Sequence, residues 1–447
     1  MTVAVDFGNF LTRTTYGDLP DQAVDHAAML VASTIASAAS GRDIESAAII
    51  RDLARERGGT PEASVWFDDG PKLPAIYAAR ANALMSDAAA SDDSDLRNIV
   101  HAGTPLTATA LALAERTGAN GRDILAAMVI GYEAAGRIGA SVTNGINNIG
   151  FHGCLGAAFG AAVAAARLLK LNAAQMAHTL ALTSTSMGGL RAAANTSISR
   201  EYHAGQATMA GIDAAMAAQK GYTGELGIFE APKGFCAVFG GGSSDGITRD
   251  LGQDWDIVTD MAVKLVPGGH HYHAMAEAAA NAARAGDIAP DDIAAIIVSV
   301  PGMKALSPPL HPANLIDMAH SPAYFTAAGA VDRTFGWANA SPEKIADPAI
   351  HRVIDRVRVG PEPTENIAAY RQGATVTIET KNGRSVTDTV HVPNGAGMLG
   401  IDWADIDTKY RALAPHALDS RQIADSLAIL HDFRQVSDIA TLIDCLR

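Results

Sequence analysis

The sequence predicts a mainly α protein in which a large helical domain is interrupted by a smaller α+β domain. Ala-rich segments with helical spacing fill the N-terminal half, β-branched runs follow after about residue 285, and helical patterns return after Gly400. This order indicates an all-helical domain over residues 1–268 that is completed by residues 397–447. The intervening residues 269–396 then form the α+β domain, with an antiparallel sheet.

The first helical pattern runs from residue 21 to about residue 39, and Gly41 closes it. Three further Ala-rich segments show the same spacing, at residues 76–90, 107–116 and 124–140, and the glycines of a GANG sequence break the chain between the last two. A glycine run at residues 240–242 lacks the Gly-Lys-Ser/Thr ending of a phosphate loop and follows no clear strand. It therefore predicts a flexible connection.

Strand signals begin at residues 293–302, a β-branched run closed by Pro-Gly, and residues 352–363 end in a similar way. The clearest signal is a hairpin. Residues 375–379 alternate polar and apolar side chains, Asn382-Gly383 predicts a type I′ turn, and valines continue the alternation beyond the turn. We expect a half-buried antiparallel sheet in this part of the chain.

Composition and charge limit the classes of partner. The 447 residues are 48% hydrophobic but only 5% aromatic and include 42 glycines, which favours closely packed helices with small residues at their contacts. The net charge is −14 and no block of basic residues occurs, which argues against nucleic acid or an anionic membrane as a partner. A negatively charged substrate therefore needs a local basic pocket.

Cysteine content and the N-terminal residues bear on location. The three cysteines, Cys154, Cys236 and Cys445, are widely spaced and odd in number, which favours a reducing compartment over a disulfide framework. The start MTVAVDFGNF has no basic n-region, and the longest uncharged apolar run, residues 153–166, is too short to span a bilayer. We expect a soluble, cytoplasmic protein.

One short stretch concentrates groups that suit catalysis. Residues 261–274 hold Lys264, a Pro-Gly-Gly turn and three histidines, and an Ala-rich helical pattern follows at once. Free N–H groups at a helix start attract carboxylate or phosphate, and the helix dipole keeps a histidine neutral and able to act as a base. The ordinary alternative is that His270, His271 and His273 lie on a solvated helix start. No carboxylate or thiol lies near them at ligand spacing, so we expect no metal site.

Six motifs occur in a fixed order along the chain. They are GYEAAGRIG (131–139), FHG (151–153), LNAAQMAHTLALTSTSMGGL (171–190), YHAGQA (202–207), EAPKGFCAVFGGG (230–242) and a Lys-x-x-Pro at 264–267. In this order and spacing the chain resembles the MmgE/PrpD family over nearly its whole length. The resemblance implies a helical domain with an α+β lid, a homodimer, and an enzyme without metal or organic cofactor. It also implies a small polycarboxylate substrate and abstraction of a proton beside a carboxylate.

Position by position, the resemblance implies an active site between the two domains. Family histidines fall on His101, His152 and His203, and the family's first lysine falls on Arg200. The second lysine falls on Lys264, and the tyrosine of the lid motif falls on Tyr324.

These residue types suit proton transfer beside a carboxylate. Arg200 would clamp a carboxylate at two points, Lys264 would supply a positive charge, and Tyr324 would hydrogen-bond a developing oxyanion. We predict that the catalytic residues are His152, His270 or His271, and Lys264. The predicted substrate-binding residues are His101, Arg200, His203, Tyr324, Asp92 and Asp93. Taken singly, each has an ordinary alternative as a surface charge, a packed histidine or a core residue.

Two positions depart from the family pattern. The family's Asp-Phe-Asp-Asp-Thr segment is replaced by AASDDS, so Ala90 stands where an aspartate is expected, while Asp92 and Asp93 remain. The family's base histidine falls on Gly269, and the shift of one residue to His270 turns a side chain by about a quarter turn on a helix start. The usual substrate and stereochemistry are therefore open.

Two hypotheses about function follow. The first is a cofactor-free lyase or isomerase that removes a proton α to a carboxylate or carbonyl, with dehydration, decarboxylation and epimerisation all open. The second is a paralogue of the same fold that binds a ligand or partner without catalysis, which Ala90 and Gly269 would explain. Retention of the basic residues and of Tyr324 favours the enzyme.

Overall fold

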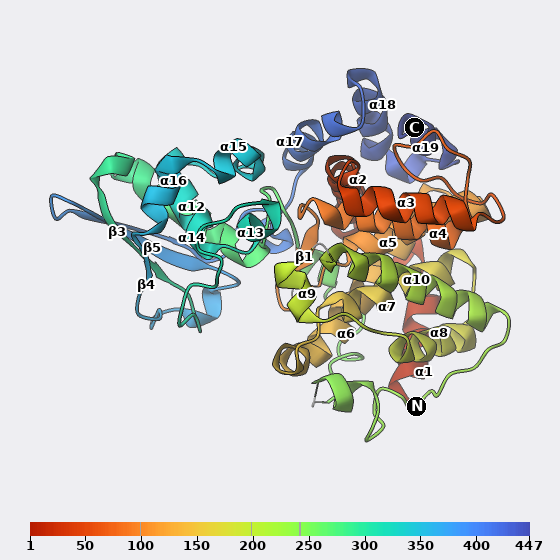
Figure 1. Cartoon of the computed structure of the whole chain (residues 1–447). Helices are drawn as coiled ribbons and strands as arrows, with labels where there is room; N and C mark the ends of the chain where they lie inside the picture. The colour runs from red at the N-terminus through yellow and green to blue at the C-terminus, as the bar shows by residue number, and fades with distance from the viewer. Residues whose placement is uncertain (99, 198, 241–242) are drawn as a thin grey trace. The chain divides into compact units, whose positions relative to one another are not determined.

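The computed structural model describes residues 1–98, 100–197, 199–240 and 243–447 (Figure 1). The chain divides into two compact units. One, the helical unit, comprises Met1–Ala194, Ile198–Val263 and Gly400–Arg447, and the other, the α+β unit, comprises Asn195–Ser197 and Lys264–Leu399. The main division falls at 263/264 and 399/400, a few residues from the expected 268/269 and 396/397. The mainly α class is confirmed.

Helices make up nearly all of the helical unit. Their bounds are α1 Val3–Arg13, α2 Asp21–Gly41, α3 Glu45–Arg57, α4 Ala75–Ala88, α5 Gly103–Thr117, α6 Gly121–Ile149, α7 Cys154–Leu168, α8 Ala173–Thr185, α9 Arg191–Thr196, α10 Arg200–Gln219, α11 Asp256–Thr259, α17 Trp403–Leu413, α18 Ser420–His431 and α19 Ala440–Cys445. The C-terminal helices α17 and α18 pack on α2, so the last part of the chain completes this unit (Figure 1).

The centre of the helical unit is α7, whose sequence CLGAAFGAAVAAARL is buried along almost its whole length. It packs against α5, α6, α8 and α10. Small residues allow these close contacts, since a Cβ on Gly211 of α10 would lie 2.6 Å from the backbone nitrogen of Ala162. The many alanines and glycines of the sequence therefore serve as helix contacts.

The expected helix breaks occur where the glycines predict them. Gly118 adopts a left-handed conformation with φ +71 and ends α5. Asn120 then caps α6, because its side chain accepts a hydrogen bond from the backbone N–H of Asp123. The second glycine run follows a π-helical turn at Cys236–Gly240, and its members Gly241 and Gly242 lie outside the described residues.

The helical unit is not all-helical. Strand β1 (Asp93–Asp95) pairs antiparallel with β2 (Met261–Val263), with Ser94 opposite Ala262. The sequence Asp-Ser-Asp has low strand propensity, so no pattern predicts β1. All three residues of β1 are buried, and tertiary partners of the two aspartates take the place of that propensity.

The α+β unit contains one four-stranded sheet in the order β4-β3-β5-β6. The element bounds are α12 His273–Ala285, β3 Ile293–Ser299, α13 Leu315–Ala319, α14 Pro322–Asp332, α15 Pro342–Ile345, α16 Pro348–Ile354, β4 Val357–Val359, β5 Ala374–Thr380 and β6 Ser385–Val390. Strand β5 is antiparallel to β3 and β6, but β4 is parallel to β3, so the expected antiparallel sheet is mixed. The helices between β3 and β4 return the chain to the same edge, which permits a parallel pair.

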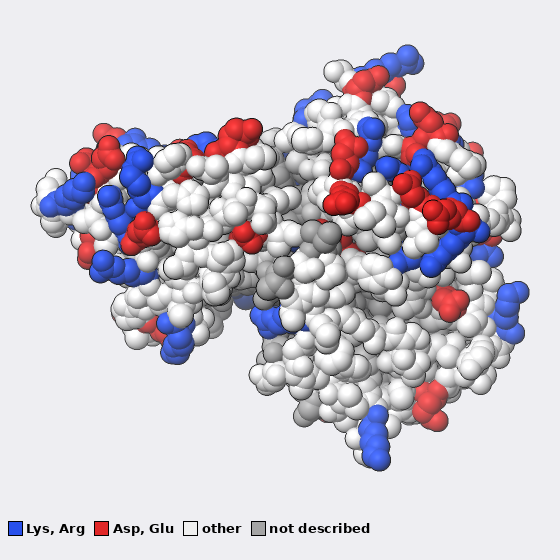
Figure 2. Space-filling model, viewed as in Figure 1, with Lys and Arg blue, Asp and Glu red and all other residues white. Residues whose placement is uncertain are grey.

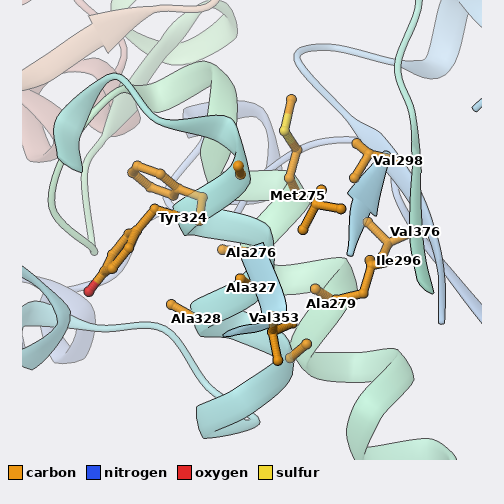
Figure 3. Close-up of a cluster of buried hydrophobic side chains, with 14 of the residues drawn as sticks. Met275, Ala276, Ala279, Ile296, Val298, Tyr324, Ala327, Ala328, Val353 and Val376 are labelled. Atoms are coloured by element: carbon orange, nitrogen blue, oxygen red, sulfur yellow. The ribbon is translucent and has the colours of Figure 1, made fainter. Parts of the chain in front are cut away.

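The core of the α+β unit lies between the sheet and the helices α12 and α14. Figure 3 shows Met275 and Ala279 of α12, Ile296 and Val298 of β3 and Val376 of β5 converging in this cluster. The alternating burial of β5 agrees with the period-2 pattern that predicts the hairpin.

The hairpin turn differs from the expected type. A type I′ turn needs positive φ at both central residues, but at this turn only Gly383, with φ +82, has one. The N–H of Gly383 donates to the carbonyl of Thr380 at 2.9 Å, and the N–H of Thr380 donates to the carbonyl of Arg384 at 2.8 Å. The loop is therefore one residue longer than predicted, with glycine in the left-handed position that follows a tight turn.

Charged side chains are unevenly spread over the helical unit. On the face shown in Figure 2 they gather over α3, while the surface over α10 and α8 is largely uncharged. Among the described helices, none is both long enough and apolar enough to cross a membrane.

Candidate active site

Three histidines of the helical unit form a row. The ring of His152 lies between those of His101 and His203, with centroid distances of 6.2 Å and 5.2 Å. His101 precedes α5, His152 lies between α6 and α7, and His203 is in the first turn of α10. The fold therefore brings together three of the residues that the sequence predicts for the site.

The chain is held firmly at His152. Gly150, with φ +83, ends α6, and the backbone N–H of His152 donates to the carbonyl of Gly189 at 3.0 Å. The helix α7 then begins two residues later, at Cys154.

His101 is oriented by the two aspartates that precede β1 or begin it. Its Nδ1 lies 2.9 Å from Oδ2 of Asp92 and 2.6 Å from the carbonyl oxygen of Asp93. Both partners are acceptors, so Nδ1 carries a proton. The nitrogen Nε2 is then the atom that gives or takes a proton in a reaction.

Asp93 is an anchor for this segment. Its carboxylate accepts hydrogen bonds from the backbone N–H of Gly103 at 3.0 Å and from the hydroxyl of Tyr132 at 2.7 Å. Burial, with the charge of Asp92, raises the pKa of Asp93 to about 6. A Cβ on Gly103 would lie 2.5 Å from the Tyr132 hydroxyl, so only glycine fits there. Contact of Asp93 with substrate stays a prediction.

The environment of His152 favours a neutral ring. Burial lowers the pKa of His152 well below its ordinary value, and the nearby His101, His203 and Arg200 lower it further. Burial also lowers the pKa of His203, whose Nδ1 is buried without a hydrogen-bond partner among the described residues. At neutral pH both rings are therefore neutral and able to accept a proton.

Arg200, which begins α10, supplies the positive charge of this cluster. Its Nε lies 3.2 Å from Oδ2 of Asp87, and an Nη2 hydrogen is donated to the carbonyl oxygen of Asp87 at 2.6 Å. Part of the guanidinium fork is thus occupied by the end of α4. Next to it, burial raises the pKa of Glu201 to about 7. The predicted two-point grip on a substrate carboxylate stays a prediction.

A cavity of about 790 Å³ opens beside the histidine row within the helical unit. Its lining includes Cys154, Gly189, Tyr202, His203 and Gln206. It lies between α7, α10 and the segment after α8, and its volume is in the range of small-molecule sites.

The α+β unit carries a second basic cluster, formed by the stretch that the sequence singles out. His270 and His273 are both buried and stack with ring centroids 4.7 Å apart. Burial, followed by the charges of His270, Lys264 and His271, lowers the pKa of His273 well below its ordinary value. His270 and His271 form a 3-10 turn before α12 begins at His273, so they precede the helix that was expected to carry them.

Gly269 has no room for the family histidine. A Cβ at this position would lie 2.8 Å from the carbonyl oxygen of Ala319, which already accepts the backbone N–H of Gly269 at 2.9 Å. The departure from the family pattern is thus built into the packing against the end of α13.

Tyr324 has the environment of a core residue. Its side chain is fully buried in α14, and its hydroxyl donates to the carbonyl oxygen of Asn339 at 2.8 Å. Figure 3 shows the ring at the edge of the apolar cluster with the hydroxyl directed away from the labelled aliphatic side chains. The predicted contact with an oxyanion would require this hydrogen bond to break, so the ordinary alternative describes the observed state.

Sequence reasoning missed several residues around the histidine row. These are Asp87, which pairs with Arg200, Tyr132, which holds Asp93, and Cys154, which joins His152 and His203 within metal-ligand spacing. Tyr132 lies within the GYEAAGRIG motif, and Cys154 follows His152 by two positions, so both had a weak signal. Asp87 had none, because its partner is distant in sequence.

The fold and its buried basic clusters define an enzyme of the lyase or epimerase type. Family models agree over most of the chain: the MmgE/PrpD N-terminal domain matches residues 5–247, and the MmgE/PrpD C-terminal domain matches residues 266–432. The chain belongs to the MmgE/PrpD family. The alternative of a non-catalytic paralogue is not carried further.

Three relatives illustrate the similarity. Cis-aconitate decarboxylase of Homo sapiens is 22% identical over 100% of this chain and 95% of its own length. The cis-aconitate decarboxylase-like protein oryM of Aspergillus oryzae is 25% identical over 99% of this chain and 97% of its own. Cis-aconitate decarboxylase of Aspergillus terreus is 24% identical over 84% of this chain and 82% of its own.

Proposed function

We propose that this protein is a cofactor-free lyase or epimerase that moves a proton on the carbon next to a carboxylate of a small polycarboxylate. The observation that carries the proposal is the contrast between two neighbouring imidazoles. His152 is held neutral by burial, whereas His101, 6.2 Å away, lies against the carboxylate of Asp92. Groups whose environments favour opposite protonation states are the usual acid and base of one reaction.

In this proposal His152 is the base. Its neutral ring takes the proton from the carbon beside the substrate carboxylate, and the electron pair of the C–H bond moves into that carboxylate. His101, with Nδ1 engaged by Asp92, presents Nε2–H as the acid that protonates a leaving group or a carbon. For an epimerase the same two rings exchange roles on opposite faces of the carbon.

Binding of an anionic substrate requires local positive charge, because the chain as a whole carries −14. Arg200 provides this charge beside the histidine row, since its electrostatic influence lowers the pKa of both His152 and His203. A carboxylate bound there makes charge-assisted hydrogen bonds of the kind that fix orientation. The substrate is therefore a small molecule with at least one carboxylate next to the reacting carbon.

Among the possible reactions, decarboxylation of cis-aconitate is the first to test, because the relatives carry that name or a name like it. It requires a proton donor as well as a base, which suits the pair His101 and His152. Dehydration and epimerisation of other dicarboxylates are the alternatives within the same chemistry.

A screen in deuterated water distinguishes these reactions. Chelator-treated enzyme is incubated with cis-aconitate and with a panel of small di- and tricarboxylates, and products are followed by proton NMR. We expect at least one compound to lose CO₂, lose water or exchange its α-proton for deuterium. Absence of exchange and turnover across the panel, with enzyme shown to be folded, would overturn the proposal.

A further inference from the structure

Three side chains with metal-ligand chemistry converge in the helical unit. His152, Cys154 and His203 each offer one ligand atom, and these atoms all lie within 4.8 Å of one another. Two imidazoles and one thiolate are donors that Zn²⁺ and similar borderline-soft cations prefer. Three protein ligands leave one coordination position open, as in metal sites that accept an exchangeable fourth ligand.

The segment after α8 builds the space between these side chains. Gly189 has φ +126, and a Cβ at this position would lie 2.6 Å from Sγ of Cys154 and 3.4 Å from Cγ of the His203 ring. The carbonyl of Gly189 holds the backbone of His152, and that of Gly188 accepts a hydrogen bond from the thiol of Cys154 at 3.3 Å. A glycine at 189 therefore keeps the region beside the sulfur open.

The protonation states suit two of the three ligands. Burial lowers the pKa of His152 and of His203, so both rings are neutral before an ion arrives. Burial raises the pKa of Cys154 to about 12, so its thiol is protonated in the free protein. A bound cation displaces that proton to solvent, because a coordinated thiol is deprotonated outright.

Only small movements complete a coordination sphere. Zn–N bonds of about 2.0–2.1 Å and a Zn–S bond of about 2.3 Å put tetrahedral ligand atoms roughly 3.3–3.6 Å apart. Ligand atoms now separated by up to 4.8 Å must thus approach by about 1 Å, which side-chain rotation supplies. Cys154 and His203 line the 790 Å³ cavity, which gives an ion and its fourth ligand a route in.

We propose that His152, Cys154 and His203 bind one Zn²⁺-like cation and that the bound ion switches the enzyme off. The binding itself stands on the geometry alone. The inhibitory effect rests on the proposed function, because the ion occupies a nitrogen of His152, the base of that reaction. The enzyme is therefore active when metal-free and inhibited when the site is filled.

Cobalt(II) is a suitable probe, since its thiolate complexes absorb strongly in the near ultraviolet. Metal-free, substrate-free protein is titrated with Co²⁺, and binding is also measured by equilibrium dialysis. We expect one ion per chain and a thiolate-to-cobalt absorption band. The variant Cys154→Ser is expected to lose the band, and His203→Gln to bind at least tenfold more weakly. The control Cys236→Ser, at another buried cysteine, is expected to titrate like the parent protein.

Absence of the band in the parent protein, or its persistence in Cys154→Ser, would overturn the cation site. If Cys154→Ser fails to fold, His203→Gln decides, and unchanged affinity in that variant refutes the site. In the second arm Zn²⁺ is added to turnover assays, where inhibition reversed by chelator is expected. Cobalt binding without zinc inhibition refutes the switch alone. Cobalt binding by a protein with no turnover refutes the proposed function and the switch, but supports the site.

Discussion

The imidazole of His101 lies against the carboxylate of Asp92, with Nδ1 2.9 Å from Oδ2. The side chain of Asp92 is almost completely buried, so this carboxylate acts through His101. It fixes the tautomer of the ring and favours its protonated form. Asp92 is thus a positioning residue in our account, although the sequence predicts it to contact substrate.

Replacement of Asp92 tests this arrangement. Asp92→Asn keeps the shape of the side chain but removes its charge, and we expect kcat to fall roughly 10²-fold, as when a general acid loses its orientation. The fall in activity on the alkaline side should also move to lower pH, because the imidazolium of His101 is no longer favoured. A variant with reduced kcat and an unshifted pH profile would assign Asp92 a merely structural role.

Asp93 makes a prediction about stability. Its pKa is raised from 3.8 to about 6 in the folded protein, so the folded state binds this proton more tightly than the unfolded state. The contribution of Asp93 to stability is therefore full below pH 3.8 and is lost as pH rises to about 6. At pH 8 the cost of the buried charge is up to about 3 kcal/mol.

We expect Asp93→Asn to be more stable than the parent protein at pH 8 and to lose that advantage near pH 4, as measured by urea unfolding. The exposed Asp254→Asn in the same unit is the control and should show no such crossover. A variant that is equally destabilised at both pH values would mean that the hydrogen bonds from Gly103 and Tyr132 outweigh the cost of the charge.

Arg200→Lys tests the carboxylate clamp. Lysine keeps the positive charge but loses the planar fork, and should weaken capture of substrate by about 1.5–3 kcal/mol, seen as a roughly ten- to hundredfold fall in kcat/KM. Thermal unfolding should be measured alongside, because Arg200 also bonds the end of α4 through Asp87. Unchanged kcat/KM with a lowered Tm would make this arginine structural.

The absence of an aspartate at position 90 predicts that 2-methylcitrate is a poor substrate. Ala90 is buried with φ +52, and alanine can neither hydrogen-bond a departing hydroxyl nor orient a histidine. Loss of one positioned acid or base costs roughly 10²–10⁴ in rate, and Gly269 removes a second expected group. Ala90→Asp is expected to raise any trace dehydratase activity, since aspartate tolerates this left-handed backbone better than alanine. Dehydration of 2-methylcitrate by the parent enzyme at about 10 per second would refute the prediction.

Much of the fold follows from local pattern. Ala-rich amphipathic spacing predicts α2, α4, α5 and α6, and alternation predicts the β5–β6 hairpin, because each signal lies within a few consecutive residues. Strand β1 could not be predicted, since Asp93 is stabilised there by Tyr132 and Gly103 rather than by propensity. The parallel strand β4 has only three residues, too few for a pattern.

The candidate site shows the same division. Family resemblance predicts the row of His101, His152 and His203, whose ring contacts the structure describes. The orientation of His101 by Asp92 and the occupation of Arg200 by Asp87 could not be predicted, because they depend on how a turn at Ala90 and the end of α4 meet other elements. The hydrogen bond of Tyr324 to Asn339 is equally a product of tertiary packing.

The central claim is that neutral His152 takes the proton without help from a metal. The most direct test measures deuterium incorporation into an active carboxylate substrate by chelator-treated parent protein, His152→Gln and the control His178→Gln. His178 is another half-buried histidine of the helical unit, and its Nδ1 accepts the backbone N–H of Gly224. We predict normal incorporation for the parent protein and His178→Gln, and at least a 10²-fold loss for folded His152→Gln. Incorporation by His152→Gln at the parent rate, or incorporation that stops on chelation and returns with a divalent ion, would contradict the account.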